Sequence, residues 1–342
     1  MSLSRCFKAV FSLKTRRLAL LGLSALTTSQ AFGGGRWDQV FIDDQDDSAI
    51  WLQGPSCEAL LPHLEAVLAW KKHLGEMLPA TRPNCECQKK GCRMELSDSL
   101  PVMAKKVVGK ASVNSGPNCW NTALVGSGIL PHLRGTSGSE LTYWLDSSPL
   151  CHKRVATEEL QPGDILAIRS DQGRTEVHAF IYASDRLTFS KHDSDAASYY
   201  ELIPMKKVLG QYPPSKGCDS FKAGHECKKR VDAYSCLTLD QFLKEHATSE
   251  KAKQLKKDIE AVECNLQQAL FSQLKDNGLE STILGTLGPL STLLTAELTE
   301  KNLPECSVGD AVLLQGLRYR IESIQSEFRE LGKEYTGRIF RK

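Results

Sequence analysis

An odd number of cysteines behind an export signal constrains this chain more than any other sequence feature. The basic run "KTRR" precedes the apolar run "LALLGLSAL", and the small residues Ser29 and Ala31 then fit a cleavage site. Such a short apolar run cannot cross the core of a bilayer. We therefore expect a signal peptide over residues 1–31 and a secreted or periplasmic protein. Its removal takes Cys6 away and leaves all the others of the 12 cysteines.

The eleven remaining cysteines cannot all pair within one chain. The leftover cysteine is either a free thiol or a bridge to a second chain, and we expect a monomer rather than a dimer. The segment "NCECQKKGCRM" crowds three cysteines together without a clear CxxC pair, so export favours disulfides over a zinc site there. We expect no metal and no cofactor.

The charge of the mature chain excludes some classes of partner. Removing residues 1–31 takes away five basic residues and no acid, which changes the formal charge from +2 to −3. A mildly acidic chain has no electrostatic reason to bind nucleic acid or anionic lipid. No later stretch is long and apolar enough to span a membrane.

Composition and periodicity divide the mature chain into three parts. Residues 32–99 form a helical, cysteine-rich segment, residues 100–235 a mixed core, and residues 236–342 a helical domain. The expected fold class is α+β, with a cysteine-bearing helix on an antiparallel sheet, a C-terminal helical bundle and disulfides.

Turn signals and hydrophobic periodicity place the elements within these parts. Short segments in which apolar and polar residues alternate, bounded by turn residues, predict strands within residues 160–169, 176–184, 187–192 and 199–205. Apolar stripes predict helices over residues 56–74, 249–278 and 309–332, with a shorter helix after Pro289. The last stripe steps by three and four as in a coiled-coil seam, and we interpret it as packing within one chain.

One cysteine stands in a setting that suits chemistry, within "GPNCWNTAL". Gly116-Pro117 breaks the preceding structure, and Asn118 suits a helix N-cap, so Cys119 begins the helix. Unpaired N–H groups and the positive helix end favour an anion, which lowers the pKa of a thiol. The same groups could hold an oxyanion, and Asn118 is an alternative donor. Cys119 is therefore the predicted nucleophile.

A cysteine nucleophile needs a base, and His178 stands in the most ordered setting of the histidines. Strand alternation gives Val177, Ala179 and Ile181 an apolar face and places His178 on the other face. A helix that opens with Cys119 could pack on that second face. The alternative role for His178 is a structural histidine bonded to a carbonyl.

A third polar group should orient the imidazole of His178. In the next strand, His192 and Ser190 share one face, and His192 is the preferred candidate. Glu176, two residues before His178, is a further rival. The predicted catalytic set is Cys119, His178 and His192, with Ser190 and Glu176 as orienting alternatives.

These motifs resemble the NlpC-type cell-wall peptidases, a compact branch of the papain-like fold. The resemblance covers about residues 100–212 and consists of the cysteine that opens a helix, "PGDI", and "HAFIYAS". It implies that Cys119 and His178 are the nucleophile and the base, and that the third residue lies near Ser190 or His192. It also implies hydrolysis of amide bonds in peptidoglycan stem peptides through a thioester.

Two other function classes fit the same sequence. A binding module could retain the fold and Cys119 without catalysis. A disulfide-rich structural or adhesion protein could use the odd cysteine as a bridge between chains. Within the enzyme class, an endopeptidase, an amidase and an acyltransferase would share one dyad.

Overall fold

The structure is a computed structural model, and it combines helices with antiparallel sheets in an α+β arrangement. It describes residues 39–42, 49–89, 91–170, 174–223, 227–271, 277–297 and 307–339. The expected signal peptide lies outside these ranges. From Trp37 onward the chain forms one compact unit.

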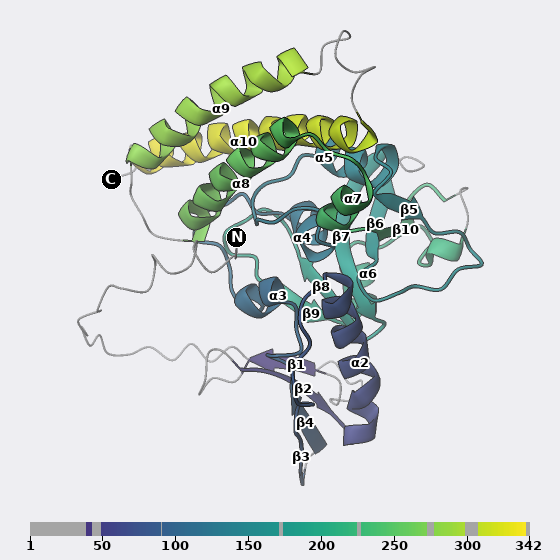
Figure 1. Cartoon of the computed structure of the whole chain (residues 1–342). Coiled ribbons are helices and arrows are strands. Elements are labelled where there is room, and N and C mark those ends of the chain that lie inside the picture. Colours follow the sequence, from purple (N-terminus) through teal and green to yellow (C-terminus); the bar gives the residue numbers. More distant parts are fainter. Residues whose placement is uncertain are drawn as a thin grey trace. The chain divides into compact units, whose positions relative to one another are not determined.

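A six-stranded antiparallel sheet forms the centre of this unit (Figure 1). Its strands follow the order β5-β10-β6-β7-β8-β9. The strand bounds are β5 Cys151–Lys153, β6 Ile165–Ser170, β7 Thr175–Ser184, β8 Leu187–Lys191, β9 Tyr200–Ile203 and β10 Arg230–Cys236. The strands expected from alternation between turn residues are thus confirmed in β6 to β9. Their pairing places β7, the strand of His178, in the interior of the sheet.

Both faces of this sheet are buried, so every residue of β8 and the first five residues of β6 are buried. One face packs into the main core through Ala179, Ile181 and Phe189. The opposite face forms a smaller core around Leu166 and Phe180. Covering both faces removes the alternation of apolar and polar residues that a half-exposed strand shows.

Helix α4 (Cys119–Gly126) packs on β7 and β8 from the main-core side. A Cβ atom on Gly126 would lie 2.5 Å from Cγ1 of Ile181, so only glycine lets the helix approach so closely. We expected this helix on the face that carries His178. The structure instead places it on the face of Ala179 and Ile181, because that face carries the larger apolar surface.

A second, four-stranded antiparallel sheet lies before the central one in sequence. Its order is β1-β2-β4-β3, with bounds β1 Gln39–Ile42, β2 Ile50–Gly54, β3 Cys85–Gln88 and β4 Gly91–Glu95. Helix α2 (Cys57–His73) contacts this sheet and β7. The side chain of Ser56 caps the helix by accepting from the N–H of Ala59.

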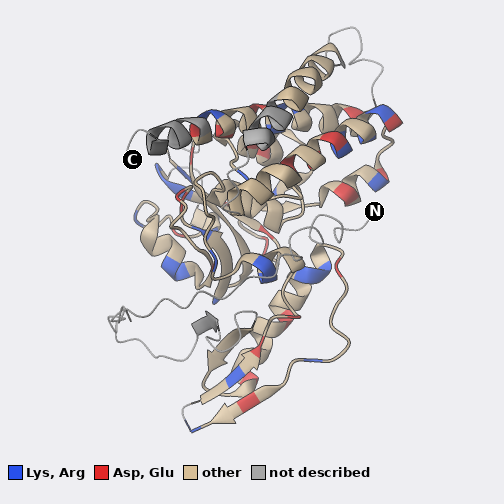
Figure 2. Ribbon diagram, turned by 90° about the vertical axis from the view of Figure 1, so that its left-hand side faces the viewer, with Lys and Arg blue, Asp and Glu red and all other residues tan. Residues whose placement is uncertain are grey.

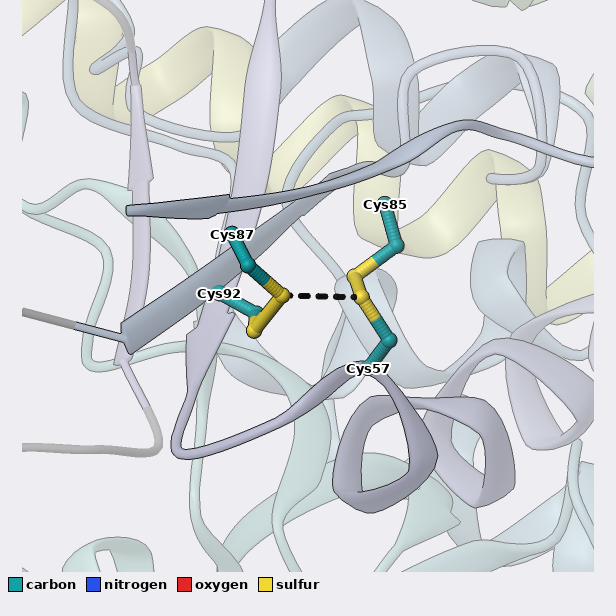
Figure 3. Close-up of side chains that lie close together, drawn as sticks. All are labelled: Cys57, Cys85, Cys87 and Cys92. Carbon is teal, nitrogen blue, oxygen red and sulfur yellow. Dashed lines mark hydrogen bonds between the residues drawn. A yellow bond between two sulfur atoms is a disulfide. The ribbon is translucent and has the colours of Figure 1, made fainter. Parts of the chain in front are cut away.

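Disulfides staple this cysteine-rich segment, as Figure 3 shows. Cys57 bonds to Cys85 and Cys87 bonds to Cys92. The sulfurs of the two bridges approach each other, with 3.4 Å between Sγ of Cys57 and Sγ of Cys87. Sulfurs that are bonded to each other are not available as thiolate ligands, so the expected disulfides take the place of a zinc site.

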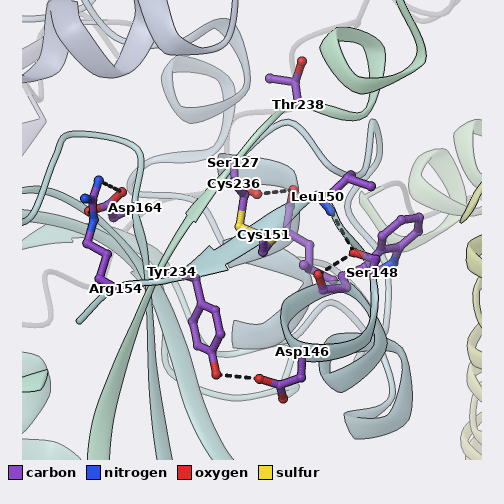
Figure 4. Close-up of a disulfide and its surroundings, with 12 residues drawn as sticks. Ser127, Asp146, Ser148, Leu150, Cys151, Arg154, Asp164, Tyr234, Cys236 and Thr238 are labelled. Atoms are coloured by element: carbon purple, nitrogen blue, oxygen red, sulfur yellow. Dashed lines mark hydrogen bonds and ion pairs between the residues drawn. A yellow bond between two sulfur atoms is a disulfide. The ribbon is translucent and has the colours of Figure 1, made fainter. Parts of the chain in front are cut away.

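A further bridge joins the central sheet at its edge (Figure 4). Cys151 on β5 and Cys236 on β10 are direct cross-strand partners and form a disulfide. Nearby, the hydroxyl of Tyr234 donates to Asp146 at 2.8 Å. Cys218 bonds to Cys227. The edge strand β5 is short, and the bridge anchors it covalently.

Short helices connect these parts. Their bounds are α3 Val102–Val107, α5 Gly138–Thr142, the π-helical turn Tyr143–Ser147, α6 Met205–Gln211, the 3₁₀ turn Phe221–Ala223 and α7 Leu239–Glu245. Among the described residues, no helix combines the length and apolar character that a membrane crossing requires.

The C-terminal region is helical, with α8 (Glu250–Phe271), α9 (Asn277–Glu297) and α10 (Val308–Ile339) in mutual contact. Acidic and basic residues are interspersed on the helices (Figure 2), and Lys256 pairs with Glu260 one turn further along α8. Two expectations were wrong. Asn277 and Gly278 begin α9 instead of ending the preceding helix, and Pro289 lies inside α9 instead of preceding a helix.

A buried charge network joins these helices to the core. The carboxylate of Glu263 on α8 accepts from Nε of Arg134 at 2.8 Å and from Nε of Arg320 on α10 at 2.9 Å. Arg134 also forms a two-point ion pair with Glu140. All four side chains are fully buried. Buried charges are tolerated only when paired, so the helices and the core depend on each other.

Candidate functional site

Cys119 is the free cysteine among the described residues. Eight others form the four bridges above, and Cys264 is also disulfide-bonded. Among the described cysteines, Cys119 is thus the one left over as a free thiol. The expected N-cap is also confirmed, because Oδ1 of Asn118 accepts from the N–H of Asn121 at 3.0 Å.

Asn118 is less suited to hold an oxyanion than the backbone. Its amide Nδ2 donates to the carbonyl of Thr136 at 2.7 Å, so that donor is already engaged. The N–H groups of Cys119 and Trp120 belong to the first helical turn, which leaves them without acceptors inside the helix. These two groups are the better donors for a developing negative charge.

The resting thiol of Cys119 is neutral, contrary to the expectation from its place in the helix. Its side chain is only 6% exposed, and burial raises its pKa to about 11. The N–H groups of Ala179, Trp120 and Cys119 and the charge of Lys191 act in the opposite direction. The loss of hydration outweighs them because a thiolate needs more solvation than a thiol.

The thiol reaches β7 where that strand separates from β8. Pairing between the two strands runs from Ser184 and Leu187 to Ile181 and Phe189. Ala179 lies beyond the last pair, and its N–H group approaches the sulfur of Cys119. The separation of the strands thus brings the thiol to the peptide group that joins Ala179 to His178.

His178 is fully buried beside Phe180, with 6.0 Å between the ring centroids. Its Nε2 lies 3.0 Å from Oγ of Ser190, while its Nδ1 has no hydrogen-bond partner. Burial lowers the pKa of His178 to about 3, and the charge of His192 lowers it further. The imidazole is neutral and forms no hydrogen bond to Cys119. Its free Nδ1 is therefore the nitrogen available for proton transfer.

The orienting contact to His178 comes from Ser190 rather than from His192. His192 lies just past the end of β8, and its Nε2 contacts Glu201 at 2.6 Å. Ser190 is still within the strand and directly faces the imidazole. The geometry thus favours Ser190 over the residue that sequence analysis preferred.

Glu176 does not contact His178, because a β-bulge lies between them. The register with β6 pairs Ile168 with His178 but Arg169 with Glu176, which leaves Val177 as an extra residue. Because of this extra residue, Glu176 and His178 lie on different faces of β7 although they are two residues apart. Glu176 instead binds Nε of Arg169 at 3.0 Å.

Sequence reasoning missed Tyr212 as a part of this site. The phenol ring stacks on His178 with 3.9 Å between centroids and a 10° angle between planes. Its hydroxyl donates to the carbonyl of His192. Tyr212 follows α6, and no local pattern predicts that it covers the imidazole.

Lys191 is the second residue that sequence reasoning missed, although the alternation of residues along β8 could have identified it. Alternation places it with Phe189 on the apolar face of β8, where a charged residue needs a reason to be. Its Nζ donates to the carbonyls of Asp193 and Asp195 at 2.7 and 2.9 Å. Burial lowers the pKa of Lys191 to about 8, and the Cys119 thiolate would oppose that shift. The ammonium can therefore stabilise negative charge on the sulfur.

A cleft of about 330 Å³ adjoins the start of α4. Its walls come from the segment before α4, the loop before α5, the loop after β8 and helix α10. Hydroxyl and acidic groups dominate the lining, which includes Asn118, Ser137, Ser194, Asp195, Ser323 and Glu327. The cleft thus reaches the residue that precedes Cys119.

A scan against models of known protein families found no match to this chain, and searches of curated proteins and of solved structures found none.

Proposed function

We propose that this chain is a cysteine hydrolase that cleaves amide bonds in peptidoglycan stem peptides. Its central unit would be a divergent papain-like core of the NlpC type. The observation that carries the proposal is a free thiol at a helix start that approaches the N–H of Ala179, next in sequence to a buried histidine whose Nδ1 has no partner. The disulfides support an exported location, where the wall polymer lies.

The catalytic roles follow from the donors and acceptors at each atom. In the tautomer that this mechanism requires, Nε2 of His178 donates to Oγ of Ser190, which leaves Nδ1 as the basic nitrogen. The proton of the Cys119 thiol passes to Nδ1, and Sγ attacks the carbonyl carbon of the substrate. The backbone N–H groups of Cys119 and Trp120 hold the resulting oxyanion.

Collapse of the intermediate completes the first half of the reaction. Nδ1 of His178 returns its proton to the leaving amine, and a thioester with Cys119 remains. His178 then removes a proton from water, which attacks the thioester and releases the acid. The thiol is regenerated, so protons and electrons balance over the cycle.

The resting site requires opening before this chemistry can begin. Burial is the largest cause of both unfavourable pKa values, that of Cys119 and that of His178. Tyr212 covers the imidazole, so its displacement would admit water or substrate and reverse both shifts. The same opening would have to bring Nδ1 of His178 round to the sulfur, because α4 packs on the opposite face of β7. Lys191 would then support the thiolate.

Digestion of purified muropeptides, followed by mass analysis of the products, tests the function. The native chain should release a new amine and a new carboxylate, and Cys119→Ala and His178→Ala should each lower the rate at least 1,000-fold, on the order of the losses seen for dyad members. Ser190→Ala should cost less than His178→Ala, because it removes only an orienting contact.

A matched variant separates chemistry from folding. Cys119→Ser keeps the size and the helix start but replaces the thiol, so it should fold normally and lose hydrolysis. Full activity in Cys119→Ser or in His178→Ala would refute the assignment. A folded chain that binds muropeptides without cleaving them would instead identify a binding module.

A further inference from the structure

Helix α10 contributes one buried carboxyl group to the wall of the cleft beside α4. Glu327 is 7% exposed and lines that cleft. Its Oε1 accepts from the N–H of Gly135 at 2.7 Å. Its Oε2 is buried and has no hydrogen-bond partner. A buried polar atom without a partner is costly, so a group that borders a cleft is suited to meet a ligand there.

The neighbouring backbone leaves room for this carboxyl group. Gly116 has a φ of +147°, a conformation that side chains rarely adopt. A Cβ atom at residue 116 would lie 2.1 Å from Oε1 of Glu327. Glycine thus allows the carboxyl group to lie against the turn three residues before Cys119.

Burial keeps the carboxyl group of Glu327 neutral. Burial raises its pKa to about 8, and the nearby Glu140 and Glu263 act in the same direction. Arg134 and the N–H of Gly135 act against them. The donors of Arg134 bind Glu140 and Glu263, so this guanidinium does not neutralise Glu327 by direct contact. Since Oε1 accepts from an N–H group, the proton belongs on Oε2, which makes that atom a donor.

We propose that the cleft is a substrate subsite in which Oε2 of Glu327 donates a hydrogen bond to a carbonyl oxygen of the bound peptide. This inference rests on the proposed function, since it assigns one end of the same substrate to the cleft. The lining holds no Lys or Arg among its described residues, while Asp195 and Glu330 add acidic groups. Such a surface disfavours a phosphorylated ligand and suits the amide groups of a peptide.

Binding measured without cleavage tests this subsite. Calorimetry would follow a disaccharide-tetrapeptide muropeptide on the Cys119→Ala chain at pH 6 and at pH 9. The donor is present at pH 6 and ionised at pH 9, so affinity should fall about tenfold, the usual worth of one hydrogen bond. Adding Glu327→Gln keeps an amide donor at both pH values and should abolish most of that fall.

Two further variants exclude general effects of pH and folding. Glu322→Gln removes another carboxylate from the same helix, but one that pairs with Arg318 on the surface. It should retain the full loss of affinity at pH 9. Glu327→Ala removes the donor and should bind about tenfold more weakly at pH 6. Thermal unfolding of each variant confirms that the chain is folded at both pH values.

The outcomes distinguish the subsite from the proposed function. The subsite would be overturned if affinity fell equally between pH 6 and pH 9 in the Cys119→Ala chain with and without Glu327→Gln. Unchanged binding in Glu327→Ala would also overturn it. If binding depends on Glu327 but the chain that retains Cys119 cleaves no muropeptide, the hydrolase is refuted and the subsite stands. Absence of muropeptide binding by every variant would overturn both.

Discussion

The burial of Cys119 predicts an unreactive resting thiol, which can be measured as an alkylation rate against pH. Only the thiolate reacts with iodoacetamide. Burial raises the pKa from 9.0 to about 11, and this difference lowers the thiolate fraction at neutral pH about 100-fold relative to an ordinary thiol. The rate should therefore rise about tenfold per pH unit from pH 6 to pH 10, without levelling off.

The assay treats the oxidised chain with iodoacetamide and follows the labelled Cys119 peptide by mass. Glutathione in the same tube supplies an exposed thiol as the reference. Tyr212→Ala uncovers His178 and should increase the labelling rate at pH 7, since hydration favours both charged forms. Tyr199→Ala removes a tyrosine that is 54% exposed, and it should leave the rate unchanged.

One result would refute this reasoning directly. A labelling rate that is already maximal below pH 7 would mean that a thiolate and an imidazolium exist in the closed site. Desolvation would then be weaker than the combined effect of the N–H groups and Lys191. Equal rates in Tyr212→Ala and the native chain would separately refute the covering role of Tyr212.

Three further predictions concern the stability of the fold, each measured by denaturant unfolding. Glu263→Gln should lower the free energy of unfolding by about 3–5 kcal/mol, because two buried arginines lose their shared carboxylate. Replacing both Cys151 and Cys236 by serine opens a bridge with a sequence separation of 85. Chain entropy then predicts a loss of about 4–5 kcal/mol. Gly126→Ala should cost about 1–3 kcal/mol by forcing a Cβ atom against Ile181.

Each of these predictions has a matched control within the chain. Glu322→Gln breaks an exposed ion pair and should cost about 0–1 kcal/mol. Replacing both Cys218 and Cys227 by serine opens a bridge with a sequence separation of only 9. Chain entropy predicts a loss of about 2–3 kcal/mol in the free energy of unfolding for that bridge. Gly210→Ala adds a Cβ atom with nothing within 4 Å, so it should not destabilise the helix. Equal costs in a variant and its control would contradict the stated cause.

Local sequence signals predicted much of the central unit. Asn118 as a cap, the strands around His178 and the long helices depend on short-range patterns, and these appear in the structure. The free state of Cys119 followed from counting cysteines and from its place at a helix start. Such features are determined by residues close in sequence, which one chain displays without any alignment.

The finer geometry of the site depends on contacts that no local pattern contains. The bulge at Val177 shifts the register by one residue, so alternation assigned Glu176 to the wrong face. Tyr212 and Glu327 reach the site from distant segments, and their positions depend on tertiary packing. The pKa of Cys119 also depends on how deeply the thiol is buried, which periodicity does not measure.

The loop between α4 and α5 depends on residues that are synthesised much later. The N–H of Leu133 donates to Gln267 at 2.7 Å, that of Gly135 to Glu327 at 2.7 Å, and the guanidinium of Arg134 binds Glu263. A chain interrupted before α10 would retain Gln267 and Glu263 on α8 but would leave the N–H of Gly135 without Glu327 and the cleft without its α10 wall. The cleft beside Cys119 therefore forms only when the last helix is complete, so a truncated or prematurely released chain lacks the assembled site.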